Sequence, residues 1–555
     1  MERSWSVLCL NVFSVSLLLA EVPVAPAEYR RPADWRPDRY PKTLQQLADA
    51  HAAEMERRAE REMSRVDGIN QRGRWHATGA SLDRHRCPEW FQDAKLGIFV
   101  DWGLWSLAAW CPFHTDRPFY PDWYEDRMHY DPGENGANEW GSRSYHERNW
   151  GRDFTRDDFI PLFRARRFDA AKLCRTFRAA GARYVVPFLK HHGGFCLWNS
   201  SWTFRDSVDR GPKRDIAAEF VEACRGESLK FGFYYSLSEW EYPFLGRDGK
   251  VSVGNAGLWT HTPGDVPCAD PETLCSGKVA VRDYRRGYSV PQAVEFIDRY
   301  DPDLLWYDGD WDAPAEYLGG YDISAYFYNR NEGRKEVAVN DRYGLRATTP
   351  RGTPIPKLRD RWLRAHRGDF FTDESGDTAE DLDPAKHHPW EECHGISFAY
   401  GNHWQENAAS VMDEGDFIRY FTDIVAKGGN LLLLVNLDAQ GAIPKLQEER
   451  LLQIGAWLKA NGEAIFGTRP VAPYSTADVN YTRAKDGRAT YAIVKRPAKE
   501  ATLACAVPDG AVITELSSGR ALSFVRRGGS VVVALPQDAA DRPLPVVLKI
   551  VKGEN

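Results

Sequence analysis

The 555-residue sequence has few cysteines and no long run of one charge. Its ten cysteines are scattered and form no Cys-x-x-Cys pair, which excludes a disulfide scaffold. There is no His-Glu-x-x-His motif, so we expect neither a metal site nor another cofactor.

The 72 Lys and Arg against 79 Asp and Glu give a formal net charge of −7 without charged blocks. This balance argues against nucleic acid or an acidic membrane surface as a partner.

Long hydrophobic runs are also lacking, except for one near the N-terminus. Residues 1–27 are typical of a secretory signal peptide, with Arg3, an apolar stretch from about Val7 to Ala20, and a cleavage site ending at Ala27. No later stretch reaches the roughly 20 apolar residues of a membrane helix. We expect a secreted or periplasmic protein, or a lysosomal one in a eukaryote, with no membrane span in the mature chain. An uncleaved anchor is the alternative.

The rest of the chain divides into three segments. Residues 28–82 are rich in Arg, Glu and Ala and predict an N-terminal helical extension. In residues 83–469, short apolar runs alternate with amphipathic helices, which is typical of βα units around a parallel sheet. Residues 470–555 contain short β-rich runs at regular spacing and predict an antiparallel β-sandwich.

The middle segment contains eight apolar runs that predict strands: KLGIFVDWG, ARYVVPFLKHH, LKFGFYYS, DLLWYDG, EVAVNDR, HRGDFFTDE, GISFAYGNHW and GGNLLLLVN. Helical stripes precede several of them, such as that of Leu173, Cys174 and Phe177. A doubly wound sheet usually has fewer strands and a phosphate-binding glycine loop, which does not occur here. We therefore predict an α/β fold, a (β/α)8-like TIM-type barrel followed by the sandwich.

Polar and aromatic residues end most of these runs: Asp101-Trp102, His191-His192, Tyr234-Tyr235, Trp306-Tyr307-Asp308, Asn340-Asp341-Arg342 and Asp373-Glu374. Each alone has a structural explanation, such as a core tyrosine or a surface ion pair. In a barrel, however, they converge on the face that carries the active site. Paired carboxylates beside aromatic and imidazole groups are typical of glycosidic bond cleavage. Asp308 ends the most apolar strand and is the candidate nucleophile.

Eight ordered segments resemble the motif series of the retaining α-L-fucosidase family of glycoside hydrolases: WFQDAKLGIFVDWGLWS, FLKHHGGFCLWNSSWT, GPKRDI, LKFGFYYSLSEW, PDLLWYDGDW, VNDRYG, PWEECHGISFAYG and DIVAKGGNLLLLVN. The resemblance covers roughly residues 83–470. It implies a barrel with a C-terminal β-sandwich and no metal. It also implies a two-step displacement through a covalent glycosyl-enzyme, with retention at the anomeric carbon.

The resemblance also assigns site residues. Asp308 corresponds to the family nucleophile, and Glu374 in GDFFTDESG to the acid/base, with Glu391 and Glu392 as rivals in a segment that opens a β-run. In a retaining enzyme the two carboxyl groups lie about 5 to 5.5 Å apart. The residues expected to bind the sugar are Asp101, Asp122, Trp123, His191, His192, Tyr234, Trp306 and Arg342.

Two positions depart from the family pattern. In the family the first strand normally ends G-I-F-x-H-W-G, but here Asp101 replaces the histidine. The family motif K-H-H-D-G-F has Gly193 here in place of its aspartate.

The first expectation is a hydrolase of α-L-fucosides in an oligosaccharide or glycoconjugate. Because a carboxylate accepts two hydrogen bonds at once, an enzyme for α-L-glucosides or α-L-galactosides is an alternative. A catalytically silent carbohydrate-binding protein is another. The sequence does not determine the oligomeric state or distinguish hydrolysis from transglycosylation.

Overall fold

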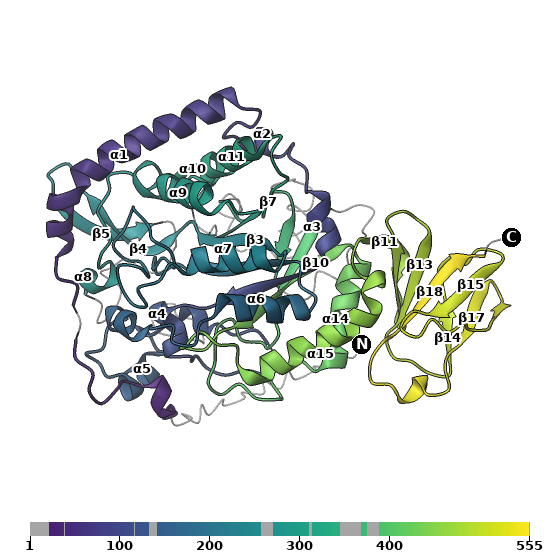
Figure 1. Ribbon diagram of the computed structural model, residues 1–555. Coiled ribbons are helices and arrows are strands. Elements are labelled where there is room, and N and C mark those ends of the chain that lie inside the picture. The colour runs from purple at the N-terminus through teal and green to yellow at the C-terminus, as the bar shows by residue number, and fades with distance from the viewer. Residues whose placement is uncertain are drawn as a thin grey trace, which may run out of the picture.

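The structure is a computed structural model that describes residues 22–37, 39–115, 117–132, 141–256, 270–309, 313–344, 368–374 and 388–553. A large α/β part is followed by a smaller all-β part that contains the C-terminus (Figure 1). In the described residues, no helix combines the length and the apolar character that crossing a membrane requires.

The α/β part is built on one parallel sheet of eight strands: β1 (Leu96–Asp101), β2 (Tyr184–Lys190), β3 (Lys230–Ser236), β6 (Leu304–Asp308), β7 (Ala338–Val339), β8 (Phe371–Asp373), β9 (Trp390–Gly395) and β10 (Gly429–Asn436). Their order across the sheet is β7-β6-β3-β2-β1-β10-β9-β8. The edge strands also meet, because Asn340 and Phe370 form a parallel bridge and Asp369 N donates to Val339 O at 2.8 Å. The sheet is thus curled, as the predicted barrel requires.

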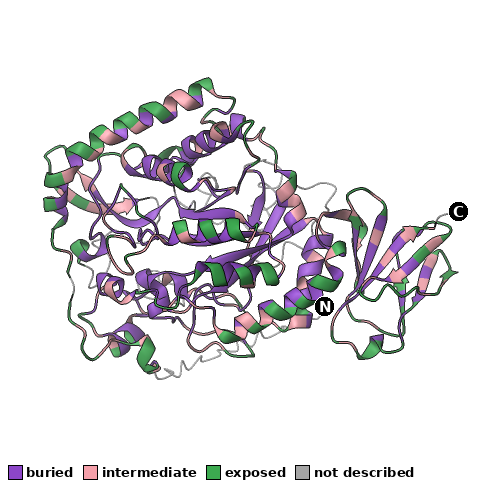
Figure 2. Ribbon diagram, in the orientation of Figure 1, coloured by how far each residue is buried: buried purple, intermediate pink, exposed green. Residues whose placement is uncertain are grey.

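Helices cover the outside of this sheet (Figure 1): α6 (Ala170–Ala179), α7 (Ile216–Gly226), α9 (Val290–Tyr300), α11 (Gly320–Asn331), α14 (Glu414–Ala426) and α15 (Lys445–Asn461). Their inner faces are buried, and α6, α7, α14 and α15 also have exposed residues on their outer faces (Figure 2). In α6 the predicted stripe of Leu173, Cys174 and Phe177 is buried, and the Asp169 carboxylate caps the helix by accepting from Lys172 N at 2.8 Å. The periodic pattern therefore located these helices correctly.

One predicted strand is wrong. GISFAYGNHW was expected to form a strand, but β9 comprises Trp390–Gly395, and the residues after Gly395 form a loop. Glu391 and Glu392 lie inside β9, so the sequence of this strand does not have the apolar pattern of a buried strand. Both residues are nevertheless fully buried. Buried carboxylates need partners, and Glu391 accepts from Trp306 Nε1 at 2.9 Å and from Tyr184 Oη at 2.5 Å.

Residues 240–285 had no readable pattern and contain a hairpin. Strands β4 (Glu239–Leu245) and β5 (Val251–Ala256) form a separate antiparallel pair. Glu239 at the start of β4 lies between two buried ammonium groups, those of Lys190 at 2.9 Å and Lys278 at 2.5 Å. These partners hold the pKa of Glu239 at about 2 despite its burial.

The N-terminal extension forms the long helix α1 (Leu44–Arg72), which begins with a capping box of Thr43 and Gln46. One face of this helix packs against α9 and α11, and Met63 and Val66 are fully buried. The helix lies along the outer edge of the α/β part (Figure 1). Its apolar residues therefore belong to the main core.

Residues after 467 form two antiparallel sheets. One has the order β11-β12-β13-β18-β15 and the other β14-β17-β16. Their bounds are β11 (Thr468–Ser475), β12 (Val479–Ala484), β13 (Ala489–Val494), β14 (Glu500–Leu503), β15 (Ala511–Glu515), β16 (Phe524–Arg527), β17 (Ser530–Ala534) and β18 (Val546–Lys552). Residues of both sheets, such as Tyr481 and Val533, share one core, which is consistent with the predicted sandwich. This part packs against α14, where Asn480 Nδ2 donates to Thr422 Oγ1 at 3.1 Å.

Candidate active site

The carboxyl ends of β1, β2, β3 and β6 bring the predicted side chains together. The register pairs Tyr234 with Trp306 and Ser236 with Asp308, so β3 and β6 end at the same level. Asp101 ends β1, and His191 directly follows β2. Neighbouring parallel strands thus deliver their terminal polar groups to one face of the sheet.

Asp308 is held by several hydrogen-bond donors. Its Oδ2 accepts from Tyr234 Oη at 2.8 Å, and its Oδ1 accepts from Gly309 N at 2.8 Å. Arg342 Nη1 lies 3.4 Å from Oδ1. The side chain is 12% exposed, so it is largely removed from water but still accessible. These contacts hold the carboxyl group in one orientation while leaving it accessible, as a nucleophile requires.

Arg342 joins Asp308 to Glu374. Its Nη2 forms an ion pair with Glu374 Oε1, while Nη1 faces Asp308 and Nε donates to Thr372 Oγ1 at 2.8 Å. The guanidinium also lies over the Trp306 ring, with Cζ 4.9 Å from the centroid. The Glu374 side chain is 31% exposed, more than that of Asp308. One buried arginine therefore fixes both candidate carboxylates on the same side of the site.

The rival carboxylates lie elsewhere. Glu391 is fully buried in β9, and both of its oxygens accept hydrogen bonds from core residues. Burial raises its pKa to about 7, against the hydrogen bonds from Tyr184 and Trp306. Glu392 is also fully buried. Burial inside β9 fits the structural role that the position of both residues in a strand suggested.

Two histidines form one wall of the site. His191 Nε2 lies 3.4 Å from Asp122 Oδ2, and His192 Nε2 lies 3.8 Å from Asp308 Oδ2. Trp123 approaches His192 edge-on, with ring centroids 5.3 Å apart. Burial raises the pKa of Asp122, and the charges of Asp308 and Glu374 raise it further. Asp122 therefore shares the electrostatic environment of both candidate catalytic residues.

The hydrogen on His192 can be assigned from its partner. Nδ1 lies 2.6 Å from Ser236 Oγ, and that hydroxyl donates its only hydrogen to Ser238 O at 2.5 Å. Nδ1 must then carry the hydrogen. Burial lowers the pKa of His192 well below its usual value, so the ring is neutral. Its Nε2 is an acceptor that faces the candidate nucleophile, where a sugar hydroxyl can donate to it.

Asp101 is the most deeply buried acid of the site. It is fully buried, and Oδ1 accepts from Trp105 Nε1 at 2.8 Å. Its other oxygen, Oδ2, is buried and has no hydrogen-bond partner within the part of the chain that the structure describes. Burial, together with the nearby charge of Asp122, raises the pKa of Asp101.

Tyr234 and Trp306 lie below these polar groups. Tyr234 stacks on Phe188 at 4.0 Å between ring centroids, and Trp306 stacks on Tyr234 at 5.7 Å. Trp306 is only 1% exposed, and its indole donates to Glu391. It therefore supports Arg342 and Tyr234 from the barrel interior. Among the predicted site residues it is, with Asp101 and His192, one of the most buried.

Comparison with known proteins identifies the family of this chain. A family model described as Alpha-L-fucosidase matches residues 63–463. This chain belongs to the α-L-fucosidase family of glycoside hydrolases. Similar relatives include the tissue α-L-fucosidase of Bos taurus, 31% identical over 418 residues, 75% of this chain and 76% of that protein. The plasma α-L-fucosidase of Rattus norvegicus is 31% identical over 472 residues, 83% and 90% of the two chains.

A solved structure of a fucosidase shares the fold. The Thermotoga maritima α-fucosidase superimposes with a TM-score of 0.66 at 28% identity, covering 86% of this chain and 100% of that chain. The match accounts for the curled parallel sheet and for polar strand ends on one face. The resemblance that the eight sequence motifs indicated is therefore confirmed.

Several residues of this fucosidase-family site were missed from sequence. Thr372 positions Arg342, and its hydroxyl donates to Asp341 Oδ1 at 2.7 Å. Trp240 of β4 lies edge-on to His191 and His192, with centroids 5.7 and 5.5 Å away. Ser236 fixes His192. Ser236 and Trp240 lie within the recognised segment LKFGFYYSLSEW, so the motif contained a signal that strand-end reasoning did not use.

Proposed function

We propose that this chain is an exo-glycosidase that hydrolyses terminal α-L-fucosides by a retaining double displacement. The observation that carries the proposal is the bridge made by Arg342, whose guanidinium contacts both Asp308 and Glu374. Close carboxylates on one side of a site suit a nucleophile and an acid/base, as retention requires. Membership of the α-L-fucosidase family supports the same sugar class.

In the first step, an oxygen of Asp308 forms a bond to the anomeric carbon while the bond to the leaving oxygen breaks. Glu374 donates its proton to that oxygen, which leaves a β-linked glycosyl ester on Asp308. In the second step, Glu374 removes a proton from water, which attacks the same carbon and releases Asp308. Asp101, Asp122, Trp123, His191, His192, Tyr234, Trp306 and Arg342 are proposed to hold the sugar.

Azide rescue of two variants tests these roles. Azide replaces the missing nucleophile in Asp308→Ala and should give a β-configured glycosyl azide. In Glu374→Ala it attacks the β-linked glycosyl-enzyme from the opposite face and should give the α anomer. The anomers are distinguished by NMR coupling constants. A Glu391→Gln control should give no azide product. Activity of Asp308→Ala near that of the wild type would contradict the assignment.

The alternative sugar has one observation in its favour. Asp101 Oδ2 is a buried acceptor without a partner among the described residues, and L-galactose has a hydroxyl that L-fucose lacks. We propose fucose as the main substrate and an α-L-galactoside or α-L-glucoside as the second candidate. Initial rates on the three aryl α-L-glycosides decide, and dominance of the fucoside removes the alternative.

We also propose export of the mature chain, with a helical extension at 28–82, a catalytic unit at 83–469 and a sandwich at 470–555. The apolar stretch and the cleavage site ending at Ala27 support export, although most of that leader, residues 1–21, lies outside the described residues. Ala25 N donates to Asn149 Oδ1 at 2.8 Å, a contact that cleavage after Ala27 removes. The mass of the exported protein identifies the cleavage point.

A further inference from the structure

Glu125 brings a carboxylate close to His191 without belonging to the predicted sugar pocket. It lies in the short helix α4 (Tyr124–Arg127) and is 2% exposed. Its Oε2 is buried and has no hydrogen-bond partner among the residues that the structure describes. A buried carboxylate oxygen left without a partner is costly, so its position calls for a function.

Gly193 makes room for this carboxylate. A Cβ on residue 193 would lie 2.8 Å from Glu125 Oε2, 3.3 Å from Cδ and 3.5 Å from Oε1. These are the three nearest atoms, so the obstacle is one carboxyl group. Gly193 is not among the glycines with positive φ, and its backbone conformation is open to any residue. The missing side chain, rather than backbone freedom, is therefore what this glycine contributes.

Glu125, Gly193 and His191 line one small cavity, together with Trp105 and Phe188. The cavity has room for about one water molecule. His191 Nδ1 is also buried without a hydrogen-bond partner in the described part of the chain, whereas Nε2 faces Asp122. A carboxylate acceptor and an imidazole nitrogen therefore border the same space, which suits a hydrogen bond between them through one bridging water.

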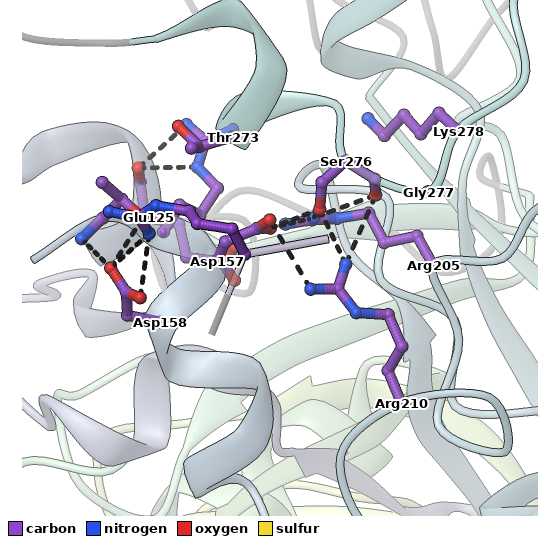
Figure 3. A network of polar contacts seen from close by, with 12 residues as sticks. Glu125, Asp157, Asp158, Arg205, Arg210, Thr273, Ser276, Gly277 and Lys278 are labelled. Carbon is purple, nitrogen blue, oxygen red and sulfur yellow. Dashed lines mark hydrogen bonds and ion pairs between the residues drawn. The ribbon is translucent and has the colours of Figure 1, made fainter. Parts of the chain in front are cut away.

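Glu125 is buried beside several cations. Burial raises its pKa, and the nearby cations Arg156, Arg205 and Lys278 oppose that shift. Each of these cations has its own acidic partner: Arg156 pairs with Glu241 and Arg205 with Asp157, both at 2.7 Å, and Lys278 pairs with Glu239 at 2.5 Å. Figure 3 shows the contacts between Arg205, Asp157 and Ser276.

The imidazole of His191 faces acids from four elements. Asp101 ends β1, Asp122 lies in η3 (Pro121–Trp123), Glu125 in α4, and Asp308 ends β6. Burial lowers the pKa of His191, and Asp308, Asp101 and Glu125 raise it again. The residues on either side of His191 in the sequence, Lys190 and His192, are also titratable.

We propose that Glu125 is a positioning residue that holds the His191 ring against the sugar, and that Gly193 is needed to admit the Glu125 carboxylate. The inference rests on the proposed function, because it takes His191 to contact the sugar.

Moving the carboxylate from residue 125 to residue 193 tests this role. In Glu125→Ala, the space of the carboxyl group opens beside Gly193. The carboxyl carbon of an aspartate there lies one bond, about 1.5 Å, beyond Cβ and so enters that space. The double variant Glu125→Ala/Gly193→Asp restores the charge, whereas Glu125→Ala/Gly193→Ala is the matched control that adds only Cβ.

We expect KM for an aryl α-L-fucoside to rise about 10-fold in Glu125→Ala, with kcat changed less than about 3-fold. The aspartate double variant should return to within about 3-fold of the wild-type KM, and the alanine control should not. Wild-type KM in Glu125→Ala, or equal recovery in both double variants, would overturn the proposal.

A second measurement does not depend on hydrolysis. NMR titration of the His191 ring, assigned by comparison with His191→Gln, should give a lower pKa in Glu125→Ala, because a neighbouring carboxylate favours the imidazolium. The aspartate double variant should reverse this change. An unaltered His191 titration in Glu125→Ala would refute the positioning role. Absence of turnover by the wild type would instead refute the proposed function.

Discussion

At the scale of single residues, Arg342 makes several contacts at once. Its guanidinium contacts two carboxylates, a threonine hydroxyl and an indole ring. A lysine has one compact charge and cannot reproduce this planar fork. We predict that Arg342→Lys lowers kcat/KM at least 100-fold, about 3 kcal/mol, because Asp308 and Glu374 lose their common support. Steady-state kinetics on an aryl α-L-fucoside measures the effect.

The control for that variant is its thermal stability. A melting temperature near that of the wild type shows that the loss of activity comes from the site and not from unfolding. Activity within 3-fold of the wild type would mean that the arginine bridge is not needed for catalysis.

Asp101 gives a prediction about stability and pH. Its burial, with the charge of Asp122, raises its pKa in the folded state. The native protein then binds this proton more tightly than the unfolded chain does, so stability falls as the pH rises above the unfolded value of about 3.9. Asp101→Asn keeps the shape and the acceptor for Trp105 Nε1 but cannot ionise. We expect it to be about 1–3 kcal/mol more stable at pH 7.

Denaturant unfolding at several pH values checks this expectation. The advantage of Asp101→Asn should shrink toward zero as the pH approaches 4. An advantage that does not change with pH would show that ionisation of Asp101 is not its source. Active-site residues often lower the stability of a protein while they increase its activity, and a lower kcat/KM in Asp101→Asn would fit this relation.

At the scale of elements, periodicity predicted the strands and those helices that have a regular apolar stripe, such as α6. Seven of the predicted strand segments contain β1, β2, β3, β6, β7, β8 and β10. The eighth failed because β9 contains two buried acids, Glu391 and Glu392, and the partners of Glu391 lie on the distant strands β2 and β6. Hydrogen bonds from residues that are distant in the sequence cannot be predicted from the local sequence of a strand. The pairing of β4 with β5 was missed for a similar reason, since Glu239 is neutralised by Lys190 and Lys278.

The site residues were predictable where they end strands. Asp308, His191 and Tyr234 follow from that rule. Glu125 was not found, because nothing in YPDWYEDRM shows that its carboxylate fits beside a glycine 68 positions further along the chain. Only the packing of α4 against the turn after β2 reveals that contact.

Helix α1 gives a prediction at this scale. Met63 is fully buried between α1 and the main core, so truncation leaves a cavity. We expect Met63→Ala to lower the free energy of unfolding by about 2–4 kcal/mol. Ser64→Ala, at the neighbouring exposed position, should change it by less than about 0.5 kcal/mol. Equal effects in the two variants would mean that the packing of α1 does not contribute to the stability of the main core.

At the scale of the whole molecule, the α/β part and the sandwich share polar contacts. Asn480 of β12 donates to Thr422 of α14, and Trp457 Nε1 of α15 donates to Pro545 O at 3.1 Å. Asn480 is fully buried, so its loss leaves Thr422 without this donor. We predict that Asn480→Ala costs about 1–3 kcal/mol and lowers the temperature at which activity is lost.

Heat inactivation and unfolding measured together test this coupling. Val512→Ala, at a position of the sandwich that is 43% exposed, is the control and should alter neither. If Asn480→Ala melts the sandwich while activity survives to the wild-type temperature, the two parts unfold independently.

The close fit between Glu125 and Gly193 also limits how this sequence can change over generations. A side chain gained at 193 collides with a carboxyl group that is already present. An acid can therefore return to 193 only if the Glu125 carboxyl group moves aside or residue 125 is shortened. The two positions form an epistatic pair, and ancestral reconstructions of this branch should place the loss of the side chain at 193 before the gain of Glu125.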